Sequence, residues 1–175
     1  MEHRRITQAR AWLLRENVWL GALALRLDPI VDATVDYMAT DGRTLRYNPL
    51  AIKDETTEAI AGVIAHEVAH CALGHFARHG NRDADGWNTA ADFPANALLM
   101  DAGFSLPTGA LIDPNYQGWS AERIYADRAG DPPTPQEQQQ AAKGRIDDAQ
   151  DGQQDGQDGD QGDDAGHAPD RARRP

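Results

Sequence analysis

The chain has 175 residues and a formal net charge of −11, with 28 acidic and 17 basic side chains. This acidic balance argues against nonspecific nucleic-acid binding, and no apolar stretch is long enough to span a membrane. The single cysteine, Cys71, excludes an intrachain disulfide, and residues 1–14 lack the apolar core of a signal peptide. Together these features predict a cytoplasmic protein.

Composition divides the chain near residue 130. Residues 1–130 carry a net charge of −5 and are long enough for one domain of common size. Residues 131–175 carry a net charge of −6 and include DAQDGQQDGQDGDQGDDAG, in which Ala is the only apolar residue. Such a segment cannot bury enough surface to offset its ordering entropy. We therefore predict a domain at 1–130 and a disordered acidic tail at 131–175, which serves as a solubilising linker or contacts a protein partner.

The N-terminal part of the domain predicts a helix followed by a hairpin. Apolar side chains recur on one helical face over residues 7–27, with a bend near Asn17, and Pro29 ends the helix. Residues 34–48 alternate apolar and polar side chains around the turn pair Asp41-Gly42, which predicts a β-hairpin. An edge of this hairpin either pairs with an extended peptide or only covers the core, and the sequence favours neither.

Residues 66–70 read His-Glu-Val-Ala-His inside the apolar run AIAGVIAHEVAHCAL. Residues four apart on a helix lie about 40° apart around its axis, so His66 and His70 can bind one metal ion from the same face. Glu67 is offset by about 100° and can reach a water on that metal. The chain has six His and seven Glu, for which random placement gives roughly 0.008 matches, so coincidence explains the motif poorly. The motif predicts a hydrolytic zinc site rather than a core helix with hydrogen-bonded histidines.

A hydrolytic zinc site needs a third protein ligand. Asp92 is favoured because it lies on a second predicted helix, from about Trp87 to Asp101, and 22 residues after His70 suit a helix–loop–helix return. His75 is the next candidate for the third ligand, but only if the motif helix ends at Gly74. His79 is expected in a solvated loop.

Further polar residues accompany Asp92. Asn88 and Asn96 share its helical face, and with His75 they are the candidates for a fourth ligand or for hydrogen-bond support of the ligands. Pro94 predicts a kink or a late start in this helix. The preceding loop partly matches a calcium-binding pattern, but we favour a polar connector with an N-cap Asp.

Two more helix boundaries are expected. Thr56 or Thr57 caps the motif helix, and Ser120 caps a last short helix that runs to Arg128.

In chain order, several segments resemble a bacterial and phage family of metallopeptidase domains, over roughly residues 7–126: LALRL, TDGRTLRYNP, GVIAHEVAHCALGH, WNTAADFPANALL and GFSLPTGALIDPNYQGWSAERIY. In many relatives a von Willebrand factor A-like domain follows, whereas here the acidic tail does. The resemblance implies that His66 and His70 are metal ligands, that Glu67 is the catalytic glutamate, and that Asp92 fills the downstream acidic position. Metzincins place Gly and His seven and ten residues after the first His, whereas here Gly74 and His75 lie eight and nine residues after His66. A gluzincin-like arrangement, with an acidic third ligand on a following helix, fits better.

The sequence thus predicts an α+β, predominantly helical fold, with a zincin-like helix pair carrying the metal site and a small β-hairpin or sheet. The expected function is a zinc-dependent metallopeptidase that hydrolyses a peptide or protein substrate, with Glu67 as general base. Candidates for a second donor to the carbonyl oxygen are Tyr116, Tyr125 and His75. The alternative is a non-catalytic zinc-binding scaffold or adaptor, which needs a fourth ligand from His75 or Cys71.

Overall fold

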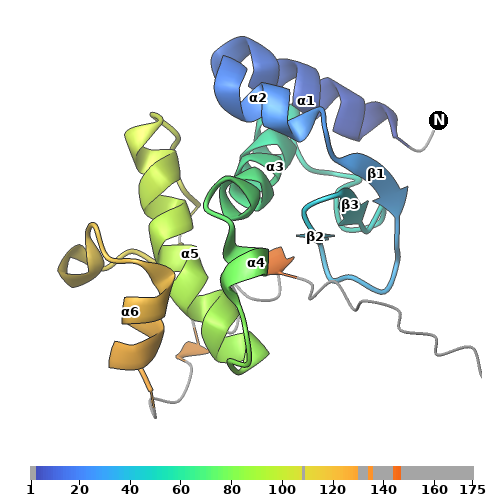
Figure 1. The fold of residues 1–175 in the computed structure, drawn as a ribbon. Helices are drawn as coiled ribbons and strands as arrows, with labels where there is room; N and C mark the ends of the chain where they lie inside the picture. Colours follow the sequence, from blue (N-terminus) through green and yellow to red (C-terminus); the bar gives the residue numbers. More distant parts are fainter. Residues whose placement is uncertain (1–2, 108, 130–133, 136–143, 147–175) are drawn as a thin grey trace, which may run out of the picture.

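The computed structural model describes residues 3–107, 109–129, 134–135 and 144–146. Over these residues the fold is α+β and predominantly helical, as predicted (Figure 1). The helices are α1 (Arg4–Glu16), α2 (Val18–Ala24), α3 (Thr57–Ala72), α4 (His75–Arg78), α5 (Ala84–Asp101) and α6 (Ala121–Asp127), with a 3-10 turn at Pro114–Tyr116. In this part of the chain, no helix has the length and hydrophobicity needed to cross a membrane.

The predicted N-terminal helix is two helices that meet at Asn17, where a bend was expected. The Asn17 side chain accepts a hydrogen bond from the Leu20 backbone N–H (3.0 Å) and caps α2. Gly21 allows α2 to approach α1 closely, because a Cβ at this position would lie 2.2 Å from the Leu14 Cα. The two helices bury their apolar faces against α3 and form the main core of the molecule.

A small sheet has the strand order β1-β3-β2-β4, from β1 (Asp28–Val31), β2 (Met38–Thr40), β3 (Thr44–Tyr47) and β4 (Gly144–Ile146). β2 and β3 form the predicted antiparallel hairpin with its turn at Asp41-Gly42. β1 pairs in parallel with β3 and was not predicted, because Pro29 indicated only the end of a helix. Pro29 is tolerated here because β1 is an edge strand.

β4 comes from the segment predicted as a disordered tail. It pairs in parallel with β2, with Met38 opposite Gly144 and Thr40 opposite Ile146. Most of residues 131–175 lie outside the described residues, so the domain boundary at 130 and the disorder of the tail stay predictions. Gly144–Ile146 itself is a strand of the sheet.

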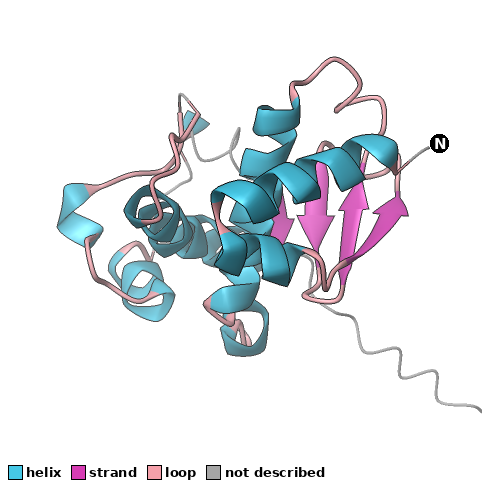
Figure 2. Cartoon of the chain, turned by 90° about the horizontal axis from the view of Figure 1, so that it is seen from above, coloured by secondary structure: helices cyan, strands magenta, loops and turns pink. Residues whose placement is uncertain are grey.

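α3 lies between the other layers of the molecule. The strands gather on one side of it and α5 with α6 on the other, in both views (Figures 1 and 2). Thr56 caps α3 by accepting from the Ala59 N–H (3.1 Å), as one of the two predicted caps. The helix ends before Gly74, whose φ of 66° is the left-handed conformation expected of a C′ glycine. The motif helix therefore spans the middle of the fold.

α5 begins at Ala84 and continues past Pro94, so of the two alternatives expected at the proline, a kink or a late start, the late start is wrong. A helix tolerates an interior proline when packing offsets the lost backbone hydrogen bond, and α5 packs on both α3 and α6. Asp83 caps α5 through the Gly86 N–H (2.8 Å), which is the N-cap Asp predicted in place of a calcium loop. Ser120 caps α6 as predicted.

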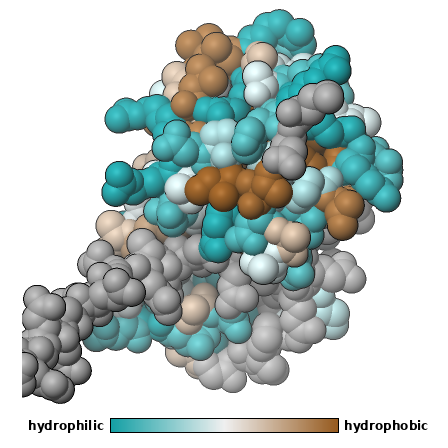
Figure 3. All heavy atoms as spheres, turned by 90° about the vertical axis from the view of Figure 1, so that its right-hand side faces the viewer, coloured by the Kyte–Doolittle hydropathy of each residue, from teal (hydrophilic) through white to brown (hydrophobic). Residues whose placement is uncertain are grey.

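Among the described residues on the face drawn in Figure 3, hydrophilic side chains predominate. On the face drawn in Figure 3, apolar side chains form separate groups among hydrophilic ones. Isolated apolar groups of this kind are normal on a protein surface. The polar residues that form the candidate site are instead buried between α3 and α5.

Candidate metal centre

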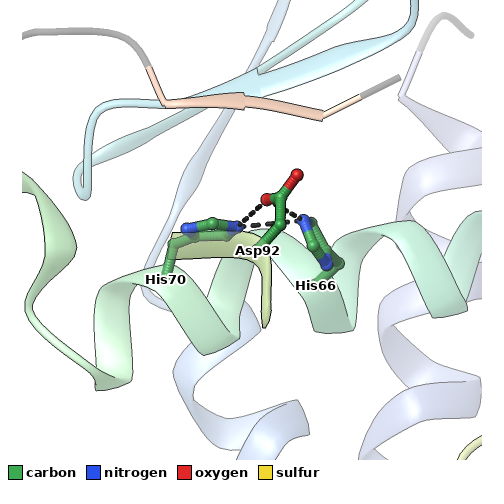
Figure 4. A group of neighbouring side chains, drawn as sticks. All are labelled: His66, His70 and Asp92. Atoms are coloured by element: carbon green, nitrogen blue, oxygen red, sulfur yellow. Dashed lines mark hydrogen bonds and ion pairs between the residues drawn. The ribbon is translucent and has the colours of Figure 1, made fainter. Parts of the chain in front are cut away.

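Three buried side chains from α3 and α5 converge (Figure 4). The Nε2 atoms of His66 and His70 lie 2.9 Å apart, and Asp92 Oδ1 lies 3.2 Å from each of them. Neither contact to Asp92 has the alignment of a hydrogen bond, and both Asp92 oxygens lack a hydrogen-bond partner. Among the described residues this is the group of His, Cys, Asp and Glu side chains whose ligand atoms lie close enough to hold one metal ion. We call these three residues the triad.

His66 is held from behind by Asn96. The Asn96 Nδ2 donates to the Leu111 carbonyl (3.0 Å), which leaves its Oδ1 facing His66 Nδ1 at 3.1 Å. An amide oxygen only accepts, so His66 Nδ1 must donate. In the neutral imidazole, Nε2 then carries a lone pair aimed at the centre of the triad.

His70 is held from behind by His75. The helix break at Gly74 returns the chain so that the Nδ1 atoms of His70 and His75 lie 3.0 Å apart. The Trp87 indole N–H donates to the His75 carbonyl (3.2 Å) and holds the turn in place. Burial, the largest cause, lowers the pKa of His75 to about 3, so its ring is neutral and one nitrogen can accept. His75 therefore lies behind a triad residue and is not one of the triad.

Glu67 is the other buried acid of the site. Its side chain is 1% exposed, and neither carboxylate oxygen has a hydrogen-bond partner. Burial raises the pKa of Glu67 to about 8, the charge of His66 opposes this, and that of Asp92 adds to it. An unpartnered buried carboxyl is costly and needs an explanation in a folded protein. Buried groups with a strongly shifted pKa cluster at functional sites.

The charges within the triad are coupled. Burial disfavours the charged form of both His66 and Asp92. For His66, the contact with Asp92 and its charge, together with Glu67 and Asn96, outweigh burial, so its pKa is raised. For Asp92, the contacts with His66 and His70 outweigh burial, so its pKa is lowered. Burial and the nearby charge of His66 lower the pKa of His70. The cluster therefore pairs one anionic oxygen with two imidazoles, which is a ligand set that suits a divalent transition metal.

The remaining predicted residues lie away from the centre. The Tyr125 hydroxyl accepts from the Asp83 N–H (3.0 Å), and Tyr116 donates to Asp127 (3.1 Å), so neither hydroxyl bonds within the triad. Asn88 is buried one turn before Asp92 on α5. His79 is half-buried beside Trp87, so the expectation of a solvated side chain is wrong.

Cys71 is a partly buried residue packed against the core. Its thiol donates to the Glu67 carbonyl (3.3 Å), and burial raises the pKa of the thiol to about 11, which disfavours the reactive thiolate.

Sequence reasoning missed the two groups that anchor the supporting side chains. The Leu111 carbonyl fixes the Asn96 amide, and the Trp87 indole fixes the His75 turn. A backbone carbonyl in a loop leaves no side-chain signal in the sequence. The indole was visible as a tryptophan at the start of the second helix, but its partner depends on how α4 folds back.

Comparison with protein families gives one match. A family model described as a putative metallopeptidase domain covers residues 1–174. No curated protein and no solved structure matches the chain.

Proposed function

Because the chain belongs to this family of putative metallopeptidase domains, we propose that it is a zinc-dependent peptidase with His66, His70 and Asp92 as metal ligands and Glu67 as general base. The observation that carries the proposal is the triad: three ligand atoms within 3.2 Å of one another, with an unpartnered carboxyl on the residue after His66.

The spacing of the ligand atoms supports zinc. Zinc binds His nitrogen and carboxylate oxygen at about 2.0–2.1 Å with tetrahedral geometry, which sets neighbouring ligands about 3.3 Å apart. The three separations of 2.9, 3.2 and 3.2 Å come close to this value. Asn96 and His75 support the same assignment, since each engages the Nδ1 of a histidine and leaves Nε2 for the metal.

Zinc bound at this triad would lower the pKa of a coordinated water to about 7 and polarise a substrate carbonyl. Glu67 receives the proton of the attacking water at its carboxylate and passes it to the leaving amine. Burial raises the pKa of the Glu67 carboxyl, and the charge of a metal ion at the triad would favour its carboxylate form, which is the form that accepts a proton. The triad histidines keep their orientation through Asn96 and His75.

A non-catalytic zinc scaffold is less well supported. Structural zinc sites are usually closed by four protein ligands, whereas the triad offers three. The two candidates for that fourth ligand are engaged elsewhere: His75 faces the rear nitrogen of His70, and the Cys71 thiol bonds a backbone carbonyl. Such a scaffold also gives no reason for the unpartnered carboxyl of Glu67.

The decisive test is Glu67→Gln in the full chain. We expect the variant to keep its zinc, measured by elemental analysis, and to lose about 10²–10⁴-fold in cleavage of an unfolded protein such as denatured casein. Glu58→Gln is the matched control, because Glu58 is exposed in the first turn of the same helix. Cleavage by Glu67→Gln at the wild-type rate would rule out the mechanism.

A further inference from the structure

The strand β4 lies beside the triad as well as in the sheet. It pairs with β2 on the side away from β3, and it also packs against α3, the helix that carries His66, Glu67 and His70. Figure 4 shows β4 crossing the site on the side toward which the Asp92 carboxylate points. A segment far along the chain thus lies on the side of α3 that carries the polar centre.

The centre is closed in this arrangement. Glu67 is 1% exposed and Asp92 is 0% exposed. A peptide bond must come within hydrogen-bond reach of a general base, roughly 3 Å, before that base can serve it. No polypeptide reaches Glu67 until a covering segment moves aside, and β4 is a short edge strand that packs against α3, the helix that carries Glu67.

The outer edge of β2, on the side away from β3, is where an extended polypeptide can bind. An edge strand presents unpaired N–H and C=O groups, and an extended polypeptide can add to it through backbone hydrogen bonds. β4 uses these groups now. Because this pairing involves the backbone, the same edge can accept another extended segment when β4 leaves.

We propose that the outer edge of β2 is a docking edge for an extended polypeptide, and that Gly144–Ile146 occupies it in the resting chain and blocks the triad. The docking edge itself stands on the strand pairing, and only its use in hydrolysis rests on the proposed function. The partner class is an unfolded or extended peptide segment, which competes with β4 for Met38–Thr40.

The first experiment measures hydrogen–deuterium exchange at residues 38–40 in the full chain. The double variant Arg145→Pro, Ile146→Pro necessarily removes an N–H that faces β2, since N–H groups alternate along a strand. The matched control is Gln153→Pro, Gln154→Pro, which places the same two prolines elsewhere in the C-terminal segment. We expect exchange roughly ten-fold faster, or more, in the first variant alone. Equal exchange in both variants and in the wild type would overturn the proposal.

The second experiment adds a synthetic peptide with the sequence of residues 141–150. We expect it to restore slow exchange at residues 38–40 in the Arg145→Pro, Ile146→Pro variant. A peptide that leaves exchange fast would show that β2 does not accept a strand supplied from outside, and the docking edge would be refuted.

Cleavage of denatured casein separates this proposal from the proposed function. Faster cleavage by the Arg145→Pro, Ile146→Pro variant than by wild type supports both the block of the triad by β4 and the peptidase function. Faster exchange with no cleavage by either protein keeps the docking edge and refutes the peptidase. Faster exchange with unchanged, measurable cleavage refutes the block on the triad.

Discussion

The two ends of the triad are supported in different ways. At the His66 end the support is an amide on α5, Asn96, which is itself fixed by the Leu111 carbonyl. At the His70 end it is a second imidazole, His75, five residues along the same chain segment. Both engage Nδ1, so both serve one purpose with different chemistry.

This difference teaches how each end depends on the fold. The Asn96 support exists only when α5 packs on α3 and the loop around Leu111 returns to α5, so it depends on contacts distant in sequence. The His75 support forms within one turn after α3, through the left-handed Gly74. Perturbing each end in turn should therefore separate long-range packing from local geometry.

Removing the residue shared by both ends should have the largest effect. Asp92→Ala takes away the anionic member of the triad and leaves two imidazole nitrogens 2.9 Å apart without it. We expect zinc affinity, measured by competition with a chelating dye, to fall by more than the roughly 100-fold typical of outer supporting residues. Asp101→Ala, an exposed change on the same helix, should leave affinity unchanged. Full zinc occupancy in Asp92→Ala would exclude this residue as a ligand.

Asn96→Ala should break the His66 end alone. The change removes the acceptor for His66 Nδ1 and the donor to the Leu111 carbonyl. We expect a loss of about 10–100-fold in zinc affinity. We also expect a loss of about 1–3 kcal/mol in the free energy of unfolding, from urea denaturation of the metal-free protein, because a buried carbonyl loses its partner. Unchanged affinity with reduced stability would make Asn96 a packing residue only.

Variants of His75 should separate its acceptor role from its volume. The Oδ1 of an asparagine can take the place of the histidine Nδ1, so His75→Asn keeps an acceptor near His70. We expect zinc affinity to fall about 10–100-fold in His75→Ala and clearly less in His75→Asn. Equal losses in the two variants would show that His75 contributes volume rather than a hydrogen bond.

The smallest effect concerns the pair that ties α4, at the His70 end, to α6. The Arg78 guanidinium donates to Glu122 (2.8 Å) and, as the main cause, lowers the pKa of Glu122 to about 2. A carboxyl with a folded pKa below its unfolded value of 4.5 stabilises the fold above pH 4.5, and this contribution is lost as pH falls toward 2.

The Arg78–Glu122 pair is partly exposed, so solvent screening keeps its contribution below about 1 kcal/mol. We expect Glu122→Gln to reduce the free energy of unfolding of the metal-free protein slightly at pH 7. The difference from wild type should shrink between pH 4.5 and pH 2 in urea titrations. A difference that does not change with pH would exclude the ion pair as its cause.

Much of this fold could be predicted from local signals. Asn17, Thr56, Asp83 and Ser120 are cap residues whose side chains bond nearby backbone N–H groups, so their effect is local and visible in the sequence. The convergence of His66, His70 and Asp92 was predicted from helical periodicity and loop length, and the structure brings these three side chains together.

What could not be predicted depends on distant contacts. β1 is a strand because it lies beside β3, and its own residues carry only a weak strand pattern. β4 lies in a segment whose composition predicts disorder, yet it pairs with β2 more than 100 residues earlier in the chain. The continuity of α5 through Pro94 likewise follows from packing on α3 and α6, which composition does not reveal.

The left-handed glycine after α3 also has a consequence for identifying distant relatives. If Gly74 is what returns His75 to the rear of His70, then the interval between them cannot gain or lose a residue, whereas the loop after Arg78 can. A search string for chains built this way is then longer than the metal motif alone: H-E-x-x-H-x-x-x-G-H, followed at variable distance by D-x-x-x-N. Chains that keep the first five letters but lack the glycine–histidine pair would need another way to orient their second histidine.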